Sequence, residues 1–188
     1  MTHASSTSIQ QGLLNAANFI ASPNKNSRPN PSDIRLIIVH GISLPPEQFG
    51  EGWIDDFFLN RLDPNQHPYF QEICGLEVSS HLLIRRDGSI TQYVPFHERA
   101  WHAGLSSYKG QENCNDFSIG IELEGTDYIP YTDKQYVELA RCCKALFEHY
   151  KTLSAESIVG HSDVAPGRKT DPGESFDWER FRRLLGEA

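Results

Sequence analysis

The chain has 188 residues, of which 38% are hydrophobic and 22% are charged, so its size and composition are those of one globular domain. Its formal net charge of -8, with scattered basic residues, excludes the positive patch that nucleic acids or anionic lipids attract. We therefore expect no nucleic acid and no membrane as a partner, and no apolar run approaches the length of a transmembrane helix.

The cysteines and the first residues predict a cytoplasmic protein. Cys74, Cys114, Cys142 and Cys143 show no CxxC spacing, and the last two are neighbours within a helical pattern. Such cysteines are typical of reduced thiols rather than of a disulfide framework. The first residues lack the basic start and the long apolar core of a secretory signal. We expect a monomer in the cytoplasm.

The first third of the chain predicts two helices around one buried strand. Residues 12–21 (GLLNAANFIA) can form a short helix that a proline-containing loop ends. Residues 35–40 (RLIIVH) are a short apolar run between turn residues, as in a strand buried on both faces. Residues 51–62 have helical spacing of large apolar side chains, namely Trp53, Phe57, Phe58 and Leu62.

Three further segments predict strands. Residues 80–95 form a hairpin, in which the Asp87-Gly88 pair supplies the positive-φ turn. Residues 117–125 (FSIGIELEG) alternate between apolar side chains and glycine or glutamate, which is the pattern of a strand. Residues 157–161 (SIVGH) form a short strand candidate.

The remaining segments predict helices, and together the elements define a fold class. Residues 132–151 form the strongest helix, because Thr132 and Gln135 make a capping box in front of one apolar stripe. Asp177 can cap a last helix. Strands and helices alternate along the chain, and the hairpin must pair antiparallel. The sequence therefore predicts an α/β (α+β) single domain with a central mixed β-sheet packed by helices.

Two histidines stand at the carboxyl ends of predicted strands. His40 follows RLIIV and His161 follows SIV. In open α/β sheets this edge is where ligands bind. A single histidine at a strand end is more often a hydrogen-bonded structural residue, so the pair indicates a site without establishing one.

Asp171 adds a third polar group near the second histidine. Pro172 favours an extended backbone at Asp171, and Gly173 permits a sharp exit, so the carboxylate can return to the same sheet edge. Two histidines and an aspartate make a three-ligand zinc site with a fourth position open for water. The alternative is an ordinary Asp-Pro-Gly surface turn. A phosphate cradle is disfavoured, because GRKT lacks the glycine-rich approach of such loops.

Two glutamates compete for the role of a catalytic base. Glu122 lies on the polar face of its predicted strand beside Gly120, which leaves room above the sheet, and Glu124 has the same geometry. Burial near a cation would prepare either carboxylate to accept a proton. A solvated strand face is the alternative, and spacing alone does not choose between them.

Four blocks of the sequence resemble one known family. VHGISLPPEQFG, RAWHAGLSSYKG, CNDFSIGIELEGTD and GHSDVAPGRKTDPG together resemble the AmpD family of zinc N-acetylmuramoyl-L-alanine amidases, whose fold is shared with peptidoglycan-recognition proteins. The resemblance covers about residues 35–185. It implies an amidase domain at 35–174, preceded by a helix and loop at 1–34 and followed by a packing helix at 175–188.

The resemblance also implies roles for individual residues. The zinc ligands are His40, His161 and Asp171, the general base is Glu122, and Lys169 stabilises the transition state. The implied substrate-binding residues are Trp101, His102 and Arg168. Gly41 departs from the family, in which asparagine often follows the first zinc histidine.

The implied reaction is zinc-dependent hydrolysis of the amide bond between 1,6-anhydro-N-acetylmuramic acid and L-alanine. The substrate would be a soluble muropeptide, with or without N-acetylglucosamine, in cytoplasmic peptidoglycan recycling. Family membership further implies an effect on β-lactamase induction. Two alternatives are a muropeptide-binding module without activity and an amidase that attacks intact cell wall. A glycosidase that uses Glu122 would leave the two strand-end histidines unexplained.

Overall fold

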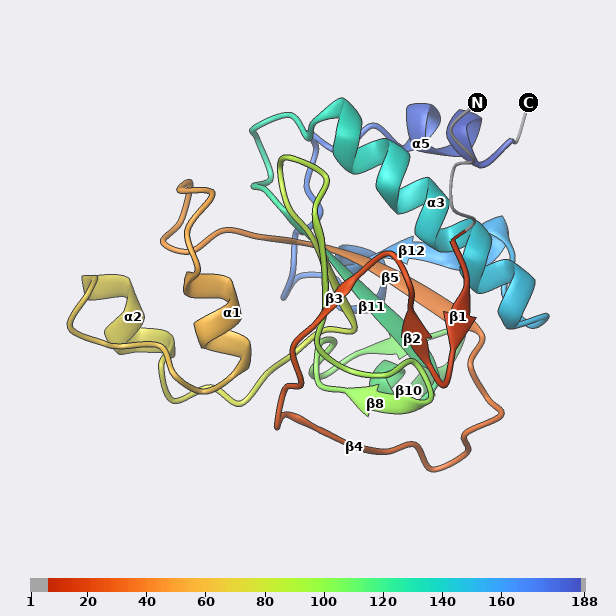
Figure 1. Cartoon of the computed structure of the whole chain (residues 1–188), viewed down its shortest axis with the longest axis horizontal. Coiled ribbons are helices and arrows are strands. Elements are labelled where there is room, and N and C mark those ends of the chain that lie inside the picture. The colour runs from red at the N-terminus through yellow and green to blue at the C-terminus, as the bar shows by residue number, and fades with distance from the viewer. Residues whose placement is uncertain (1–6, 187–188) are drawn as a thin grey trace.

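The computed structural model describes residues 7–186, and a six-stranded sheet runs through its centre (Figure 1). The strands lie in the order β12, β5, β11, β6, β7, β3. Their bounds are β3 Asn18–Phe19, β5 Leu36–Ile42, β6 Leu82–Ile84, β7 Ile90–Gln92, β11 Ser118–Glu124 and β12 Ile158–Gly160. Neighbouring strands are parallel except β6 and β7, which form an antiparallel hairpin. The predicted mixed sheet is confirmed.

The strands predicted at the site are confirmed with shifted ends. β5 continues to Ile42, so His40 lies inside the strand rather than after it. β12 ends at Gly160, and His161 begins helix α4 (His161–Val164). The hairpin turns at Gly88, whose φ of 86° is a left-handed value that favours glycine.

Helix α3 (Asp133–His149) crosses one face of the sheet, and α5 (Trp178–Leu185) lies against it (Figure 1). The side chain of Thr132 accepts the N–H of Gln135, and the Gln135 side chain accepts the N–H of Thr132, which confirms the capping box. Asp177 caps α5 as predicted. The core between these elements contains Ile37, Val39, Ile119, Ile121, Leu123, Tyr136, Leu139, Cys143, Leu146 and Phe181.

Two short helices, α1 (Trp53–Phe58) and α2 (Pro68–Ile73), stand beside the sheet on the left of Figure 1. The helix predicted at 51–62 is thus confirmed over a shorter range. Helix α2 was not predicted, although His67 accepts the N–H of Tyr69 as an N-cap before a proline at the first helical position. The two helices share a second apolar cluster, which contains Leu44, Phe57, Phe58, Leu62, Phe70, Ile73, Leu83 and Tyr93.

The predicted helix over residues 12–21 is wrong. β2 (Leu13–Leu14) pairs antiparallel with β1 (Ile9–Gln10), and β3 pairs with β7 at the sheet edge. Gly12, with a φ of 77°, makes the tight turn between the first two strands. The N–H of Leu14 donates to the side chain of Gln92 (2.8 Å). A helix of this length is marginal by itself, whereas the sheet edge satisfies the backbone groups of this segment.

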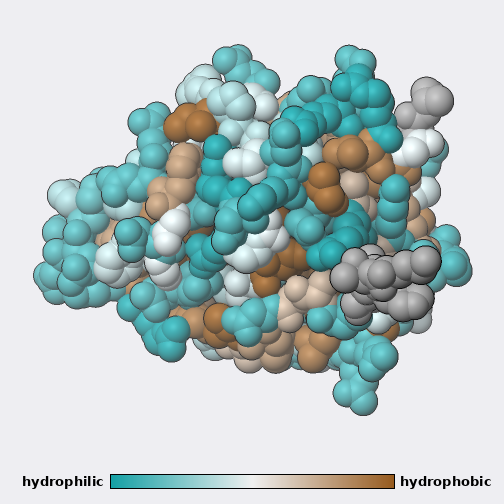
Figure 2. Space-filling model, turned by 45° about the horizontal axis from the view of Figure 1, so that its top comes forward, coloured by the Kyte–Doolittle hydropathy of each residue, from teal (hydrophilic) through white to brown (hydrophobic). Residues whose placement is uncertain are grey.

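The other elements are short. They are β4 Lys25–Ser27 with β8 Glu98–Ala100, β9 Ser107–Tyr108 with β10 Gln111–Glu112, and the 3₁₀ turns η1 Cys114–Asp116 and η2 Ala155–Ser157. Within residues 7–186 no helix has the length and apolar character to span a bilayer. On the face in Figure 2, hydrophilic residues predominate and hydrophobic ones form small separate patches. The division into 1–34, 35–174 and 175–188 stays a prediction, and residues 1–6 and 187–188 lie outside the described range.

Candidate active site

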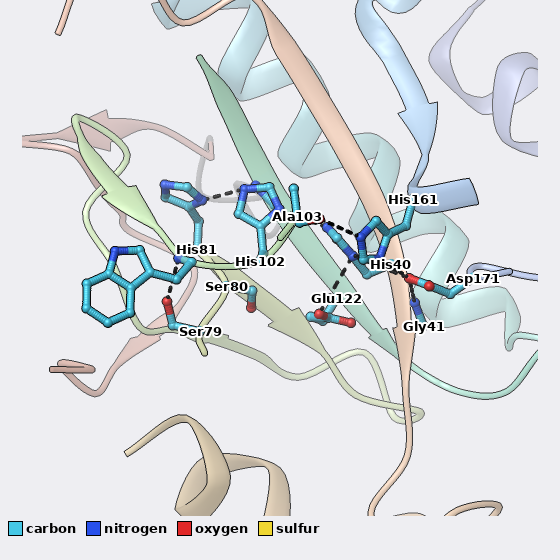
Figure 3. Close-up of polar contacts among 12 residues, drawn as sticks. His40, Gly41, Ser79, Ser80, His81, His102, Ala103, Glu122, His161 and Asp171 are labelled. Atoms are coloured by element: carbon cyan, nitrogen blue, oxygen red, sulfur yellow. Dashed lines mark hydrogen bonds and ion pairs between the residues drawn. The ribbon is translucent and has the colours of Figure 1, made fainter. Parts of the chain in front are cut away.

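The register of β5 and β11 places His40 next to Glu122. The two strands are parallel, and these residues are direct partners in the pairing. Side chains alternate along a strand, so Glu122 lies on the face of β11 opposite the apolar side chains that meet α3. β12 flanks β5 on its other side, and His161 follows it at once. The three side chains therefore meet at one edge of the sheet (Figure 3).

The chain brings Asp171 back to this edge through backbone contacts. The N–H of Ser162 donates to the Asp171 carbonyl (3.0 Å). The Tyr131 hydroxyl donates to the carbonyl of Pro172 (2.9 Å). A Cβ at position 41 would collide with that hydroxyl. Gly41 therefore leaves room for Tyr131 to brace the segment that carries the aspartate.

Donor atoms of His40, His161 and Asp171 converge in a small triangle. His40 Nδ1 lies 3.0 Å from His161 Nδ1 and 3.3 Å from Asp171 Oδ2, and His161 Nδ1 lies 3.1 Å from the same oxygen. Ligands about 2.0–2.1 Å from a tetrahedral zinc ion lie roughly 3.3 Å from one another, so the triangle fits that ion.

The hydrogen bonds of His161 give a second indication of a cation. Its Nε2 lies 3.2 Å from the carbonyl oxygen of Ala103, which can only accept, so Nε2 carries the proton. In the neutral ring this leaves a lone pair on Nδ1, which faces the carboxylate of Asp171. A lone pair and a carboxylate at this distance repel each other unless a cation lies between them. The triangle can therefore hold a metal ion.

The charge states of these residues suit a metal. Burial lowers the pKa of His40 to about 4, although contact with Asp171 acts in the opposite direction. Burial raises the pKa of Asp171, whereas donated protons or positive charge at the His161 and His40 nitrogens lower it well below its usual range. Where these nitrogens carry lone pairs instead, a metal ion would supply that positive charge. At neutral pH His40 is a neutral imidazole and Asp171 an ionised carboxylate, which are the forms that bind metals.

Glu122 differs from the other groups, because one of its oxygens is buried and unpaired. Oε1 lies 4.0 Å from His40 Nδ1, and Oε2 has no hydrogen-bond partner among residues 7–186. Burial, followed by the charge of Asp171, raises the pKa of Glu122 well above its usual value, while Lys169 opposes the shift. Such a carboxyl group beside a metal site is suited to accept and return a proton.

Glu124 lies on the same face of β11 in a different environment. One of its oxygens accepts the N–H of Gly50 (2.7 Å), and the other accepts the N–H of Arg86 (3.2 Å). Both oxygens of Glu124 are thus used to fix the backbone at Gly50 and Arg86 beside the sheet. The structure thus separates two glutamates that the sequence left equivalent.

The triangle and Glu122 form the floor of a cleft of about 290 Å³. Lys169, Trp101 and His102 also line it. One wall is apolar and comes from α1, α2 and the segments beside them, namely Leu44, Phe57, Phe58, Tyr69, Ile73 and Leu76. This wall was not predicted, because the helical spacing of residues 51–62 does not indicate which side chains face a ligand.

The predicted substrate-binding residues occupy different positions. Trp101 lies in the cleft, and its indole N–H donates to Asn26 of β4 (3.0 Å). His102 also borders the cleft, but its ring nitrogens contact protein groups. Arg168 is not among the lining residues, and its guanidinium donates to the carbonyls of Ala103 (2.6 Å) and Leu105 (2.8 Å). The structure therefore brings two of the three residues to the cleft.

A three-ligand metal site with a buried proton acceptor beside it is the arrangement of metal-dependent hydrolases. The chain belongs to the N-acetylmuramoyl-L-alanine amidase family, which matches residues 30–174. The sequence is 55% identical over 179 residues to the 1,6-anhydro-N-acetylmuramyl-L-alanine amidase AmpD of Escherichia coli. The alignment covers 95% of this chain and 97% of the E. coli protein. The family resemblance seen in the sequence is confirmed.

Solved structures support the same relationship. A crystal structure of AmpD superposes with a TM-score of 0.92 at 56% identity and covers 94% of this chain and 98% of that one. The E. coli amidase AmiD, in complex with the substrate anhydro-N-acetylmuramic acid-L-Ala-D-gamma-Glu-L-Lys, superposes with a TM-score of 0.59 at 26% identity. That match covers 95% of this chain and 65% of AmiD. The predicted fold class is confirmed.

Proposed function

We propose that this protein hydrolyses the amide bond between the lactyl group of 1,6-anhydro-N-acetylmuramic acid and L-alanine, with a zinc ion held by His40, His161 and Asp171. The observation that carries the proposal is the unpaired carboxyl group of Glu122 beside the triangle of donor atoms. A protein that only binds muropeptides would not need a buried proton acceptor at this place, because burial of an unpaired carboxyl group costs stability.

The residues would divide the chemistry between them. When bound, zinc supplies Lewis acidity, which makes water nucleophilic at neutral pH and polarises a carbonyl group. Glu122 takes a proton from the attacking water as the new carbon–oxygen bond forms. Lys169 stabilises the negative charge on the carbonyl oxygen from the side of the cleft. The carbon–nitrogen bond then breaks, and Glu122 returns the proton to the departing amine of L-alanine.

The substrate assignment rests on the relatives and on the shape of the cleft. AmpD is named for a substrate with a 1,6-anhydro-N-acetylmuramyl group, and the AmiD structure contains a substrate with an anhydro-N-acetylmuramic acid group. In this chain the apolar wall from α1 and α2 faces the polar floor, so one ligand can place a compact sugar and a peptide in the same cleft. We propose that Trp101 contacts this substrate and that Arg168 orders the neighbouring loop instead.

The proposed setting is peptidoglycan recycling by a monomer in the cytoplasm, on muropeptides with or without N-acetylglucosamine. The four cysteines are unpaired, and Cys114, Cys142 and Cys143 are buried thiols, which suits a reducing compartment. A net charge of -8 also disfavours approach to an anionic wall polymer.

The test compares two substrates. Zinc-loaded protein is incubated with purified anhydromuramyl-tripeptide and, separately, with intact sacculi, and mass spectrometry identifies the products. We expect anhydromuramic acid and free peptide from the soluble substrate, and much slower release from sacculi. Comparable or faster release from sacculi would indicate a wall-lytic amidase. Binding of the soluble substrate without cleavage would indicate a recognition module.

A further inference from the structure

His102 connects the metal site to the interior of the fold through a chain of hydrogen bonds. Its Nδ1 lies 2.9 Å from His40 Nε2, on the side of that ring away from the triangle (Figure 3). Its Nε2 lies 3.3 Å from the hydroxyl oxygen of Ser118. That hydroxyl lies 2.6 Å from the carbonyl oxygen of Cys114.

The chemistry of the last group sets the direction of the whole chain. The carbonyl of Cys114 can only accept, so the Ser118 hydroxyl donates to it. The Ser118 oxygen then accepts the N–H at Nε2 of His102, which leaves Nδ1 of this neutral ring as an acceptor. Consequently His40 donates from Nε2, and its Nδ1 keeps the lone pair that faces His161 and Asp171.

The fold holds the His102 ring in place for this contact. A Cβ at Gly120 would lie 2.5 Å from the ring, so glycine at this position lets the imidazole lie against β11. The backbone N–H groups of His102 and Ala103 both donate to the side-chain oxygen of Asn115 (3.1 and 2.8 Å). Alternate residues of one strand therefore build the site: Ser118 accepts from the ring, Gly120 gives it room, and Glu122 is the acid–base group.

We propose that His102 is a positioning residue, which fixes the tautomer of His40 so that Nδ1 is free to bind the metal before the metal arrives. The inference rests on the proposed function only in taking His40 as a metal ligand. It gives His102 a different role from the substrate contact that the family resemblance implies. Partners of this kind are worth about 10–100-fold in metal affinity at characterised sites.

Zinc affinity in the absence of substrate tests the proposal. The metal is removed, and zinc is titrated back against a competing chelator for the wild type, His102→Leu, His102→Asn and the exposed control His97→Leu. We expect His102→Leu to bind zinc about 10–100-fold more weakly. His102→Asn keeps an acceptor oxygen near the position of Nδ1, so its affinity should stay within about threefold of wild type, as should that of His97→Leu.

The opposite patterns would overturn the proposal. Wild-type zinc affinity in His102→Leu, with a raised KM for the muropeptide, would make His102 a substrate contact. Equal losses of zinc affinity in His102→Leu and His102→Asn would mean that a hydrogen-bond acceptor at the position of His102 Nδ1 does not determine zinc affinity. Because the zinc titrations use no substrate, they remain informative even if the protein cleaves no muropeptide.

The tautomer itself can be observed directly, which separates positioning from a structural role. In the metal-free wild type, long-range 1H–15N NMR spectra should show His40 protonated at Nε2 and His102 protonated at Nε2. Ser118→Ala leaves both rings in place but removes the acceptor that orients His102, so it should populate His102 protonated at Nδ1. This variant also serves if His102→Leu does not fold. Unchanged tautomers in Ser118→Ala, or His40 protonated at Nδ1 in the wild type, would refute the proposal.

Discussion

Glu122→Gln separates proton transfer from metal binding. Glutamine has the shape of glutamate, and Glu122 is outside the triangle of donor atoms, so the variant should bind zinc as the wild type does. It cannot accept a proton from water, and loss of a general base costs about 10²–10⁴ in rate. This corresponds to about 2.7–5.4 kcal/mol on the barrier.

The assay is kcat on anhydromuramyl-tripeptide with zinc content measured on the same samples, and Glu124→Gln is the matched control. Glu124 accepts two backbone N–H groups, so its variant should lose about 1–3 kcal/mol of stability with little change in kcat of the folded protein. Retention of more than a tenth of kcat in Glu122→Gln would refute the proposed base. A hundredfold loss of kcat in folded Glu124→Gln would assign that role to the other glutamate.

Three further predictions concern the same site. His161→Ala should abolish stable zinc binding, because it removes one corner of the triangle, and full zinc occupancy with normal activity would contradict the ligand assignment. Lys169→Ala should keep zinc and lower kcat by about 10²–10³, as expected for one group that stabilises an oxyanion, and an unchanged kcat would remove Lys169 from the mechanism. In the metal-free protein, burial lowers the pKa of His40 from 6.5 to about 4, so the unfolded chain takes up this proton first as the pH falls. His40 alone should therefore cost the protein about 3 kcal/mol of stability between pH 6.5 and 4. The shifted pKa values of Glu122, His81 and His102 add pH dependence of their own, so the measurement is the difference between denaturant titrations of the wild type and of His40→Ala, and equal pH dependence in both would contradict the assignment.

Local signals in the sequence predicted the elements whose stability is local. The capping box at Thr132 and the apolar stripe behind it identified α3, and the apolar run before His40 identified β5. The helix predicted over 12–21 is wrong because its apolar residues also fit a helix, whereas the strands found there depend on pairing with β1 and on distant partners such as Gln92. Its environment in the sheet outweighed its own weak preference.

The two glutamates show a limit of periodicity. A period of two places Glu122 and Glu124 on one face of β11 and says nothing of what covers that face. Their difference depends on the N–H groups of Gly50 and Arg86, which lie 74 and 38 residues away in the chain and donate to the two oxygens of Glu124. Partners at such separations are set by tertiary structure, so pattern analysis of a single strand cannot supply them.

The triangle of donor atoms depends on the order of the strands, which no local pattern contains. His40 and His161 are 121 residues apart in sequence, yet their Nδ1 atoms lie 3.0 Å apart because β12 pairs with β5. Neighbouring strands are spaced about 4.7–4.9 Å apart, so each further strand between the two histidines would add roughly that distance. Had β12 joined the sheet beyond β3, at the opposite edge, the same residues at the same strand ends would lie more than about 20 Å apart. Strand-end histidines thus identify candidates, and it is the order β12, β5, β11 that brings His161, His40 and Glu122 into one row.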